Sequence, residues 1–535
     1  MSDSIGSTDS IASAVARTVQ QVRELYIASG IADWDSAVNG TQENLEKAAA
    51  ARSAWLHFWA DPAAFEQFRD WDQSHATGAD SLLARQIHLL HYRYAQEQRD
   101  SDTIDEITQL MMKIDDAYTN FRGKVGGEPL TNNAIEQILE DEVDNEVRRE
   151  AWEASKQIGP LVADNIRQLA RLRNQTAYKM GYANFHRMNL ELDEIDPDWL
   201  YAMLDNLAVA TDGPFREVKG ELDAHLSQRY RVPVEDLRPW HYSDMFFQRA
   251  PKVGSVDLDV FFDGQNLEAL ALKTYDGLGM DTRDVIARSD LYERPMKNQH
   301  AFCIHVDREG DVRTLCNLQS NRRWMDTILH ELGHAVYDKY IPHEIPWFLR
   351  EPAHILSTEA MAILMGGMTF ERDWLTQIRD LDAAEVDGII KQVAQYRRLE
   401  RLIFARWVMV MVNFERGMYE DPERDLDTLW WDLIEKYQFV KRPEARTMPD
   451  WATKYHVALA PAYYQNYLIG EMMSVQWQRW LDAHAGGLIN RAAAGDFFRD
   501  RVFAVGRTMT WNDALEQATG EKLNIQYYVD KCNAV

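Results

Sequence analysis

Hydrophobic and polar positions alternate at helical spacing through nearly the whole chain. Between Pro160 and Gly181, for example, apolar residues lie three or four positions apart, at Val162, Ile166 and Leu169. A proline at the start and a glycine at the end of such a pattern are typical of an amphipathic helix. The first hundred residues, rich in alanine, glutamine and charge, follow the same period. The pattern predicts a mostly α-helical fold.

One stretch departs from the helical period. Residues 300–306 (HAFCIHV) are rich in β-forming side chains, residues 307–311 (DREGD) have the composition of a turn, and residues 312–318 (VRTLCNL) are β-forming again. This order predicts an antiparallel hairpin. Such a hairpin either packs against its neighbours or offers its edge strand to an extended peptide by strand addition.

Residues 324–340 follow the hairpin with apolar residues at helical spacing and no proline before Pro342, which predicts an amphipathic helix. This helix would carry the run HELGH, from His330 to His334. Residues four apart lie on one face of a helix, so the two histidines can direct imidazole nitrogens at one zinc ion. Glu331 is placed to take a proton from a metal-bound water. The motif predicts a zinc site that hydrolyses a peptide bond, although a pattern with three fixed positions also arises by chance.

A catalytic zinc ion usually has three protein ligands and one position left open for water. The downstream candidates for the third ligand are Asp338, Glu344, Glu351, His354 and Glu359. Glu359 differs from the others because it lies in an otherwise apolar helical run, residues 355–365 (ILSTEAMAILM), where a bare carboxylate is costly to bury. A metal ion would supply its partner; an ion pair with an arginine is the structural alternative. We expect His330, His334 and Glu359 to hold one zinc ion.

Length and composition limit the remaining possibilities. The chain has 535 residues, 46% of them hydrophobic, with no internal repeat or low-complexity linker, and we expect one domain, residues 1–535. A formal net charge of −27 argues against nucleic acid and anionic membranes as partners, and no obligate protein partner is evident. The N-terminus has no secretory signal pattern, no apolar run approaches a membrane span, and three cysteines make no disulfide framework. We expect a cytoplasmic enzyme, or a periplasmic one only if a signal was removed.

Several separated segments resemble the angiotensin-converting enzyme family of zinc peptidyl-dipeptidases, in a bacterial-type form. Besides HELGH, they are residues 244–248 (DMFFQ), 300–301 (HA), 429–438 (LWWDLIEKYQ) and 454–467 (KYHVALAPAYYQNY). Residues 461–468 (PAYYQNYL) are also similar to the oligopeptidase F and thimet oligopeptidase relatives. The resemblance implies a large gluzincin-type helical domain, with two lobes around a deep cleft and a small antiparallel sheet beside the zinc helix. Residues 1–100 would form a lid over that cleft.

The resemblance also implies roles for matching residues in the reaction. Glu331 would be the general base and later the acid. Tyr467 would donate its phenol hydroxyl to the developing oxyanion, and His456 would hydrogen-bond the tetrahedral intermediate, because such donors meet charge that grows toward the transition state.

Other matching residues would bind the substrate. Gln248, Lys454 and Tyr463 would grip a free C-terminal carboxylate, since an amide, an ammonium and a phenol suit an anion with two oxygens. His300 and Ala301 would pair with the substrate backbone. From residue type alone, Lys454 is more often a solvated surface lysine, the tyrosines ordinary core aromatics, and Gln248 a helix cap or a surface amide.

The chain departs from the family pattern at three positions. Ile434 and Asn466 stand where vertebrate members place arginines that bind activating chloride, so chloride dependence is doubtful. Ile363 stands where a carboxylate is expected four residues after the glutamate ligand, so the hydrogen-bond partner of one zinc-ligating histidine must differ. Two spacings differ as well, since those from His334 to Glu359 and from His456 to Tyr467 are each one residue longer than the family pattern.

Together these features predict a zinc metallopeptidase that acts on short peptides, with a zinc-bound water as nucleophile and Glu331 as general base. A clamp two residues beyond the scissile bond would make it release C-terminal dipeptides. One alternative is a zinc endo-oligopeptidase of the oligopeptidase F or thimet type, which needs no free carboxylate. Another is a catalytically silent peptide-binding protein, against which the intact general base and oxyanion candidates argue.

Overall fold

The structure, a computed structural model, describes residues 8–75, 80–251 and 257–534. Helices dominate these residues, and the strands among them form two antiparallel sheets of two strands each. The prediction of a mostly α-helical fold with a small antiparallel sheet is confirmed. The chain divides into two compact units, each assembled from separate stretches of sequence.

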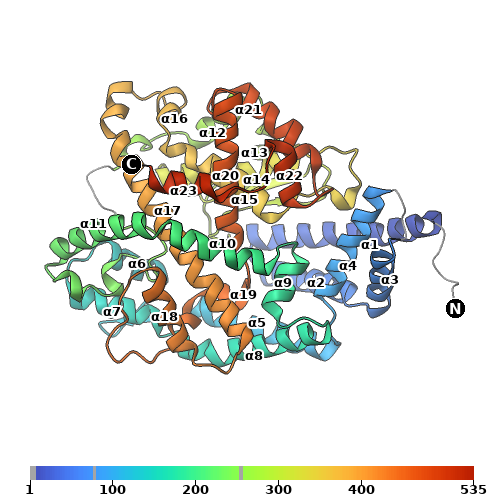
Figure 1. The fold of residues 1–535 in the computed structure, drawn as a ribbon, viewed down its shortest axis with the longest axis horizontal. Coiled ribbons are helices and arrows are strands. Elements are labelled where there is room, and N and C mark those ends of the chain that lie inside the picture. Colours follow the sequence, from blue (N-terminus) through green and yellow to red (C-terminus); the bar gives the residue numbers. More distant parts are fainter. Residues whose placement is uncertain (1–7, 76–79, 252–256, 535) are drawn as a thin grey trace. The chain divides into compact units, whose positions relative to one another are not determined.

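The first unit consists of Met1–Gln98, Val256–Lys391 and Ile469–Tyr528. Its longer elements are α1 (Thr8–Val38), α2 (Gln42–Trp59), α3 (Pro62–Gln73), α4 (Ser81–Gln96), α12 (Leu267–Gly277), α13 (Arg283–Arg288), β3 (Phe302–His305), β4 (Val312–Leu315), α14 (Arg322–Lys339), α15 (Ile355–Gly366), α16 (Arg372–Gln377), α21 (Ala492–Phe497) and α22 (Trp511–Thr519) (Figure 1). Its short helical turns are η3 (Asp259–Phe261), η4 (Trp347–Leu349), η5 (Gly367–Phe370), η7 (Phe498–Val502) and η8 (Phe503–Val505).

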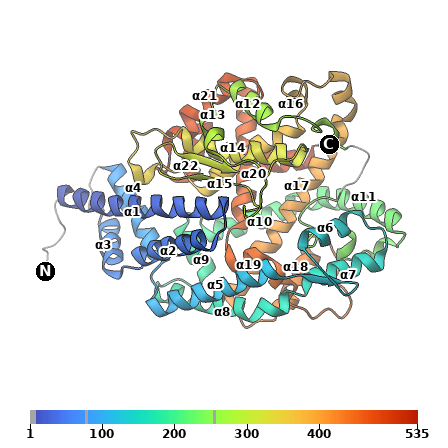
Figure 2. The same cartoon turned by 180° about the vertical axis from the view of Figure 1, so that it is seen from behind.

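Within this unit the N-terminal helices pack in pairs, α1 with α2 and α3 with α4 (Figures 1 and 2). The predicted hairpin is confirmed: β3 pairs antiparallel with β4, with Phe302 opposite Leu315 and His305 opposite Val312. Both strands lie against α14, and α14 packs along α15. The first hundred residues are helical as predicted, and their role as a lid stays a prediction.

The second unit consists of Arg99–Ser255, Gln392–Leu468 and Val529–Val535. Its elements are α5 (Ser101–Asn120), β1 (Gly123–Val125), β2 (Glu128–Leu130), α6 (Asn132–Asp141), α7 (Asn145–Lys156), α8 (Gly159–Lys179), α9 (Phe185–Leu192), α10 (Pro197–Ala210), α11 (Asp212–Tyr230), η1 (Val234–Asp236), η2 (Pro239–His241), α18 (Leu426–Tyr437), η6 (Asp450–Thr453) and α19 (Tyr455–Leu459). Three helices contribute residues to both units: α17 (Ala383–Glu420), α20 (Tyr464–His484) and α23 (Ile525–Asn533). The predicted cleft and the single-domain organisation stay predictions.

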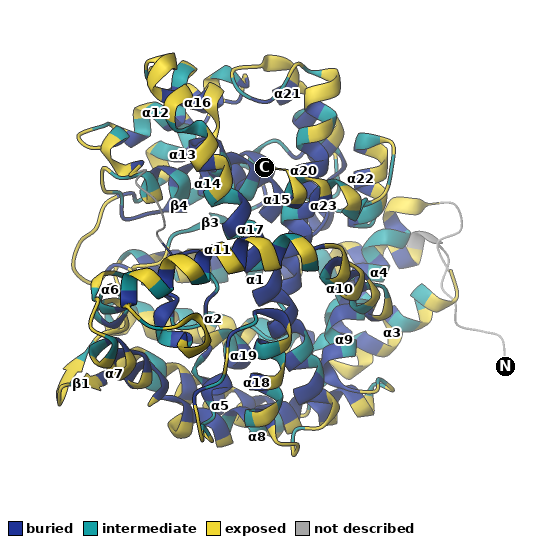
Figure 3. Cartoon of the chain, turned by 60° about the vertical axis from the view of Figure 1, so that its left-hand side comes forward, coloured by how far each residue is buried: buried dark blue, intermediate teal, exposed yellow. Residues whose placement is uncertain are grey.

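Burial follows the hydrophobic pattern of each helix. Figure 3 shows α15 buried almost throughout, whereas α11 alternates buried and exposed positions. α15 contains the apolar run in which the sequence places Glu359. The carboxylate of Glu359 is buried there, in the core of the first unit. None of the helices in the described ranges is both long and apolar enough to cross a membrane.

Candidate functional site

Helix α14 carries the HELGH run, as the sequence predicts. It begins after Asn321, whose side chain caps the helix by accepting a hydrogen bond from Trp324 N at 2.9 Å. The rings of His330 and His334, one turn apart, have centroids 4.9 Å apart and planes inclined by 81°. The helical spacing therefore places both imidazoles together on one face.

Glu359 of α15 completes a possible metal site. One ligand atom from each of His330, His334 and Glu359 lies within 4.8 Å of the other two, the only such trio of histidine, cysteine or acidic residues in the described ranges. His330 Nε2 is 3.8 Å from Glu359 Oε2, and Glu359 is 6% exposed. Two imidazoles and a buried carboxylate at this separation fit a zinc ion, which accepts three such ligands and keeps one position open.

Glycines allow the helices around Glu359 to approach closely. A Cβ atom at Gly333 of α14 would lie only 2.9 Å from Ala362 Cα of α15. A Cβ atom at Gly470 of α20 would lie 3.0 Å from Leu356 O and 3.2 Å from Glu359 Cβ. These distances are shorter than carbon side chains tolerate without displacement. Helix α15, which carries the candidate third ligand, thus packs closely against α14 at Gly333 and against α20 at Gly470.

Thr358 provides a hydrogen-bond partner for His334, in place of the carboxylate that the family pattern expects at position 363. His334 Nδ1 is 2.7 Å from Thr358 Oγ1, so a hydroxyl, in place of a carboxylate, orients the ring and leaves Nε2 for a metal. Burial lowers the pKa of His334 well below its usual value, and the charge of His330 lowers it further. The neutral imidazole is the form that binds metal.

Glu331 is buried beside the candidate ligands. Burial raises its pKa to about 7; the charge of His330 lowers the pKa and that of Glu359 raises it. A carboxyl group that titrates near neutral pH can both take up and release a proton. This is the property that the predicted general base requires.

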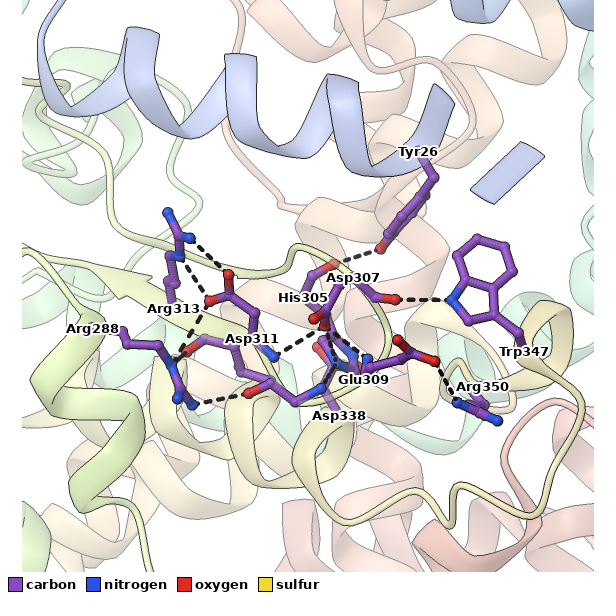
Figure 4. A network of polar contacts seen from close by, with 12 residues as sticks. Tyr26, Arg288, His305, Asp307, Glu309, Asp311, Arg313, Asp338, Trp347 and Arg350 are labelled. Atoms are coloured by element: carbon purple, nitrogen blue, oxygen red, sulfur yellow. Dashed lines mark hydrogen bonds and ion pairs between the residues drawn. The ribbon is translucent and has the colours of Figure 1, made fainter. Parts of the chain in front are cut away.

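The strand predicted to hold the substrate is anchored at its C-terminal end (Figure 4). Tyr26 of α1 donates its hydroxyl to His305 O at 2.8 Å, and Trp347 Nε1 donates to Asp307 O at 2.8 Å. Asp311 in the turn accepts two hydrogen bonds from Arg313, at 2.8 and 2.7 Å. These contacts fix the turn and the end of β3 while leaving β4 as the only strand partner of β3 among the described residues.

His300 and Ala301 lie outside this ladder. β3 begins at Phe302, so the strand is shorter than the predicted residues 300–306. His300 is exposed, Ala301 is half-buried, and His300 N donates to Asn298 Oδ1 at 2.8 Å. Their pairing with a substrate backbone stays a prediction.

In the second unit, Lys454 and Gln248 lie together as the resemblance implied. Lys454 Nζ donates to Gln248 Oε1 at 2.8 Å and lies 5.0, 5.4 and 5.5 Å from the ring centres of Phe246, Trp407 and Tyr464. Lys454 is only 8% exposed, so the alternative of a solvated surface lysine is wrong. Burial lowers the pKa of Lys454 to about 8, although Asp244 raises it.

Two polar side chains, those of Asp244 and Gln438, hydrogen-bond the main chain of the DMFFQ segment. Asp244 Oδ1 accepts hydrogen bonds from Phe246 N at 2.7 Å and Gln248 N at 3.3 Å. Gln438, the last residue of the KYQ run, donates to Phe247 O at 2.7 Å. Phe247 has a left-handed backbone, with φ of 52°, which a bulky residue adopts only when its surroundings hold it. The separated DMFFQ and KYQ segments thus build one structure that presents Gln248.

One further aromatic residue lies near these side chains. The ring centre of Tyr464, a residue that the sequence did not single out, is 5.5 Å from Lys454 Nζ and 4.8 Å from the ring centre of His456. The rings of Tyr463 and Tyr467 are 5.1 Å apart. The extra residue between His456 and Tyr467 is the one feature of the sequence that bears on Tyr464. Tyr464 therefore joins Tyr463 as a candidate carboxylate ligand.

His456 is suited to act as a neutral hydrogen-bonding group. Burial lowers its pKa to about 4, and the charge of Lys454 lowers it further. Its Nδ1 atom is buried and has no hydrogen-bond partner among the described residues. The roles of His456 and Tyr467 toward a tetrahedral intermediate stay predictions.

Comparison with protein families agrees with the resemblance in the sequence. The pattern of the angiotensin-converting enzyme family matches residues 7–219 and 289–527, which is most of the chain. The match includes the zinc helix, Glu359 and the segment from Lys454 to Tyr467, whereas Gln248 lies in the unmatched residues 220–288. The predicted family is confirmed: the chain belongs to the angiotensin-converting enzyme family of zinc metallopeptidases.

Proposed function

We propose that this protein is a peptidyl-dipeptidase, which binds short peptides by their free C-terminus and releases dipeptides. The observation that carries the proposal is the buried Lys454–Gln248 pair. The Lys454 ammonium donates to the neutral amide of Gln248 rather than to a carboxylate. This contact does not neutralise the positive charge of Lys454, and its remaining N–H groups can donate to an anion. A buried charge of this kind is costly unless a ligand uses it.

The residues of the first unit would carry the hydrolysis. A zinc ion held by His330, His334 and Glu359 would polarise the scissile carbonyl and make a water nucleophilic near neutral pH. Glu331 would take a proton from the attacking water and deliver it to the leaving amine. The edge of β3 that does not pair with β4 would pair with the extended peptide backbone by strand addition.

The residues of the second unit would bind the C-terminus and the developing charge. Lys454, Gln248 and a neighbouring tyrosine would hold the carboxylate, and this remote binding energy would position the scissile bond. His456 and Tyr467 would donate hydrogen bonds to the oxyanion. The number of peptide residues between the bound carboxylate and the scissile bond would set the length of the released product. With two residues in that interval, the product would be a dipeptide.

One peptide, prepared with a free C-terminal carboxylate and as its amide, tests the proposal. Loss of a charge-assisted hydrogen bond costs about 1.5–3 kcal/mol, so we expect kcat/KM to be at least about tenfold lower for the amide. Lys454→Gln should remove the difference between the two peptides. Equal cleavage by the unaltered enzyme would favour the endo-oligopeptidase alternative, and cleavage of neither peptide by zinc-loaded protein would favour a silent binding protein.

A further inference from the structure

A buried polar pair lies behind the segment that joins His456 to Tyr467. Glu415 of α17 is 1% exposed and accepts a hydrogen bond from Ala462 N at 2.9 Å. Arg173 of α8 is 5% exposed and donates to Ala458 O at 2.8 Å. Both side chains therefore bind the main chain of one short segment, residues 458–462.

That segment needs support from its surroundings. Ala462 has a left-handed backbone, with φ of 54°, a conformation that is unfavourable for a residue with a side chain. Such a conformation persists only when neighbouring groups hold it. Residues 458–462 comprise the end of α19, which carries His456, and most of the turn that leads to α20, which carries Tyr467. A movement of this segment would change the positions of both side chains.

The charges of the pair are consistent with a role in anchoring the main chain. Burial raises the pKa of Glu415 to about 8, against the opposing effects of the Ala462 hydrogen bond and the charge of Arg173. A protonated carboxyl group still accepts a hydrogen bond through its carbonyl oxygen. Arg173 also donates to Tyr419 Oη at 3.1 Å. Apolar side chains would fill the same space in the core at a lower free-energy cost than a buried carboxyl group and a buried guanidinium.

We infer that Glu415 and Arg173 are positioning residues for the reaction, which hold His456 and Tyr467 where the oxyanion forms. The inference rests on the proposed function, because it gives a purpose to the placement of those two side chains. A displacement of catalytic groups by about 1 Å can cost on the order of 100-fold in rate. The two residues would act on the rate of the chemical step and leave metal binding unchanged.

Two substitutions of Glu415 separate its hydrogen bond from its volume. Glu415→Gln keeps an uncharged acceptor for Ala462 N, and we expect kcat to stay within about threefold of the unaltered enzyme. Glu415→Met keeps the length but offers only a weakly accepting thioether sulfur, and we expect kcat to fall by at least about tenfold with unchanged zinc content. Equal loss in both variants would overturn the inference. Should Glu415→Met not fold, Glu415→Asp, which withdraws the acceptor by one methylene, should show the same fall.

Arg406 offers a matched control for Arg173. Arg406 is 2% exposed and donates to one carbonyl, Ala208 O, and one hydroxyl, Thr211 Oγ1, both at 2.9 Å. Arg173→Met and Arg406→Met thus lose the same kinds of contact. We expect both to lower Tm, but only Arg173→Met to lower kcat, by at least about tenfold. Equal effects on kcat would assign the pair a purely structural role.

Inhibitor binding gives a measurement independent of turnover. A phosphinic peptide mimics the tetrahedral intermediate, whereas acetohydroxamate reports on the metal centre alone. Glu415→Met and Arg173→Met should weaken the phosphinic peptide by at least about tenfold and leave acetohydroxamate unchanged. If the unaltered protein cleaves no peptide, the proposed function fails; if it cleaves peptides and these variants behave like it, only the positioning inference fails.

Discussion

The candidate metal ligands and the candidate carboxylate clamp are held in place by different kinds of contact. In the first unit, the ligands stand on two regular helices that approach closely because residue 333 is glycine. In the second unit, Gln248 and Lys454 project from irregular segments, and Phe247 beside Gln248 has a left-handed backbone. Polar side chains such as Asp244 and Gln438 hold that backbone in place.

The two regions should therefore tolerate different kinds of substitution. A site set by helix packing resists the loss of a hydrogen bond better than it resists added volume, because packed helices leave no room for another atom. A site set by polar contacts to irregular backbone should behave in the opposite way, because a lost acceptor leaves a buried N–H unsatisfied.

Glu331→Gln should abolish the chemistry and leave both regions intact. A general base contributes about 10²–10⁴-fold to rate, so we expect kcat to fall by at least about 10²-fold, while zinc content and the affinity for a free-carboxylate peptide stay unchanged. Peptide cleavage assays, with elemental analysis and binding titration, measure these quantities. Normal turnover in this variant would refute the role of Glu331.

Lys454 should make substrate capture depend on pH. Its pKa is lowered to about 8 by burial, so the ammonium is present below that pH and becomes a neutral amine above it. We expect kcat/KM for a free-carboxylate peptide to fall about tenfold per pH unit above pH 8. Lys454→Gln should lower kcat/KM by about 10–100-fold at pH 7 and abolish the contribution of this group to the profile. An unchanged profile in the variant would contradict the clamp.

Thr358→Val should weaken zinc binding, because the isosteric side chain cannot accept a hydrogen bond from His334 Nδ1. Removing such a partner typically costs about 10–100-fold in metal affinity, and we expect a value near the lower end because the partner is a neutral hydroxyl. Competition with a chelator of known affinity measures the change. Thr358→Ser, which keeps the hydroxyl, should bind zinc normally; equal affinities in all three proteins would be inconsistent with this role.

Gly333→Ala should destabilise the first unit by about 1–3 kcal/mol, because its Cβ would press on Ala362. Gly388 is the matched control: it lies in helix α17 with no atom within 4 Å of an added Cβ. Gly388→Ala should stabilise the protein by up to about 1 kcal/mol through helix propensity. Urea unfolding of the two variants compares them directly. Equal stability changes would contradict the importance of close packing.

The two regions also differ in how far the sequence predicts them. The grouping of the candidate metal ligands was predictable because two of them follow from the helical spacing within HELGH, and Glu359 is the one carboxylate within residues 355–365, an apolar helical run. The hairpin was predictable from its composition. These signals are local, so they need no knowledge of how distant segments pack.

The hydrogen-bonded surroundings of the site were not predictable. Lys454 and Gln248 are 206 positions apart in the sequence, and either alone resembles an ordinary surface residue. The contact between Thr358 and His334, and the position of Tyr464 beside Lys454, depend on the exact packing of separate elements. Residue types at these positions carry little information until the fold brings them together.

The most direct test of the account is the identity of the products formed from an unblocked octapeptide by zinc-loaded enzyme. Mass spectrometry should detect a hexapeptide and the C-terminal dipeptide as the first products, none after the metal is removed by a chelator, and both again when zinc is restored. Internal fragments as the first products would contradict the account. Cleavage that continues after the chelator has removed the metal would also contradict it.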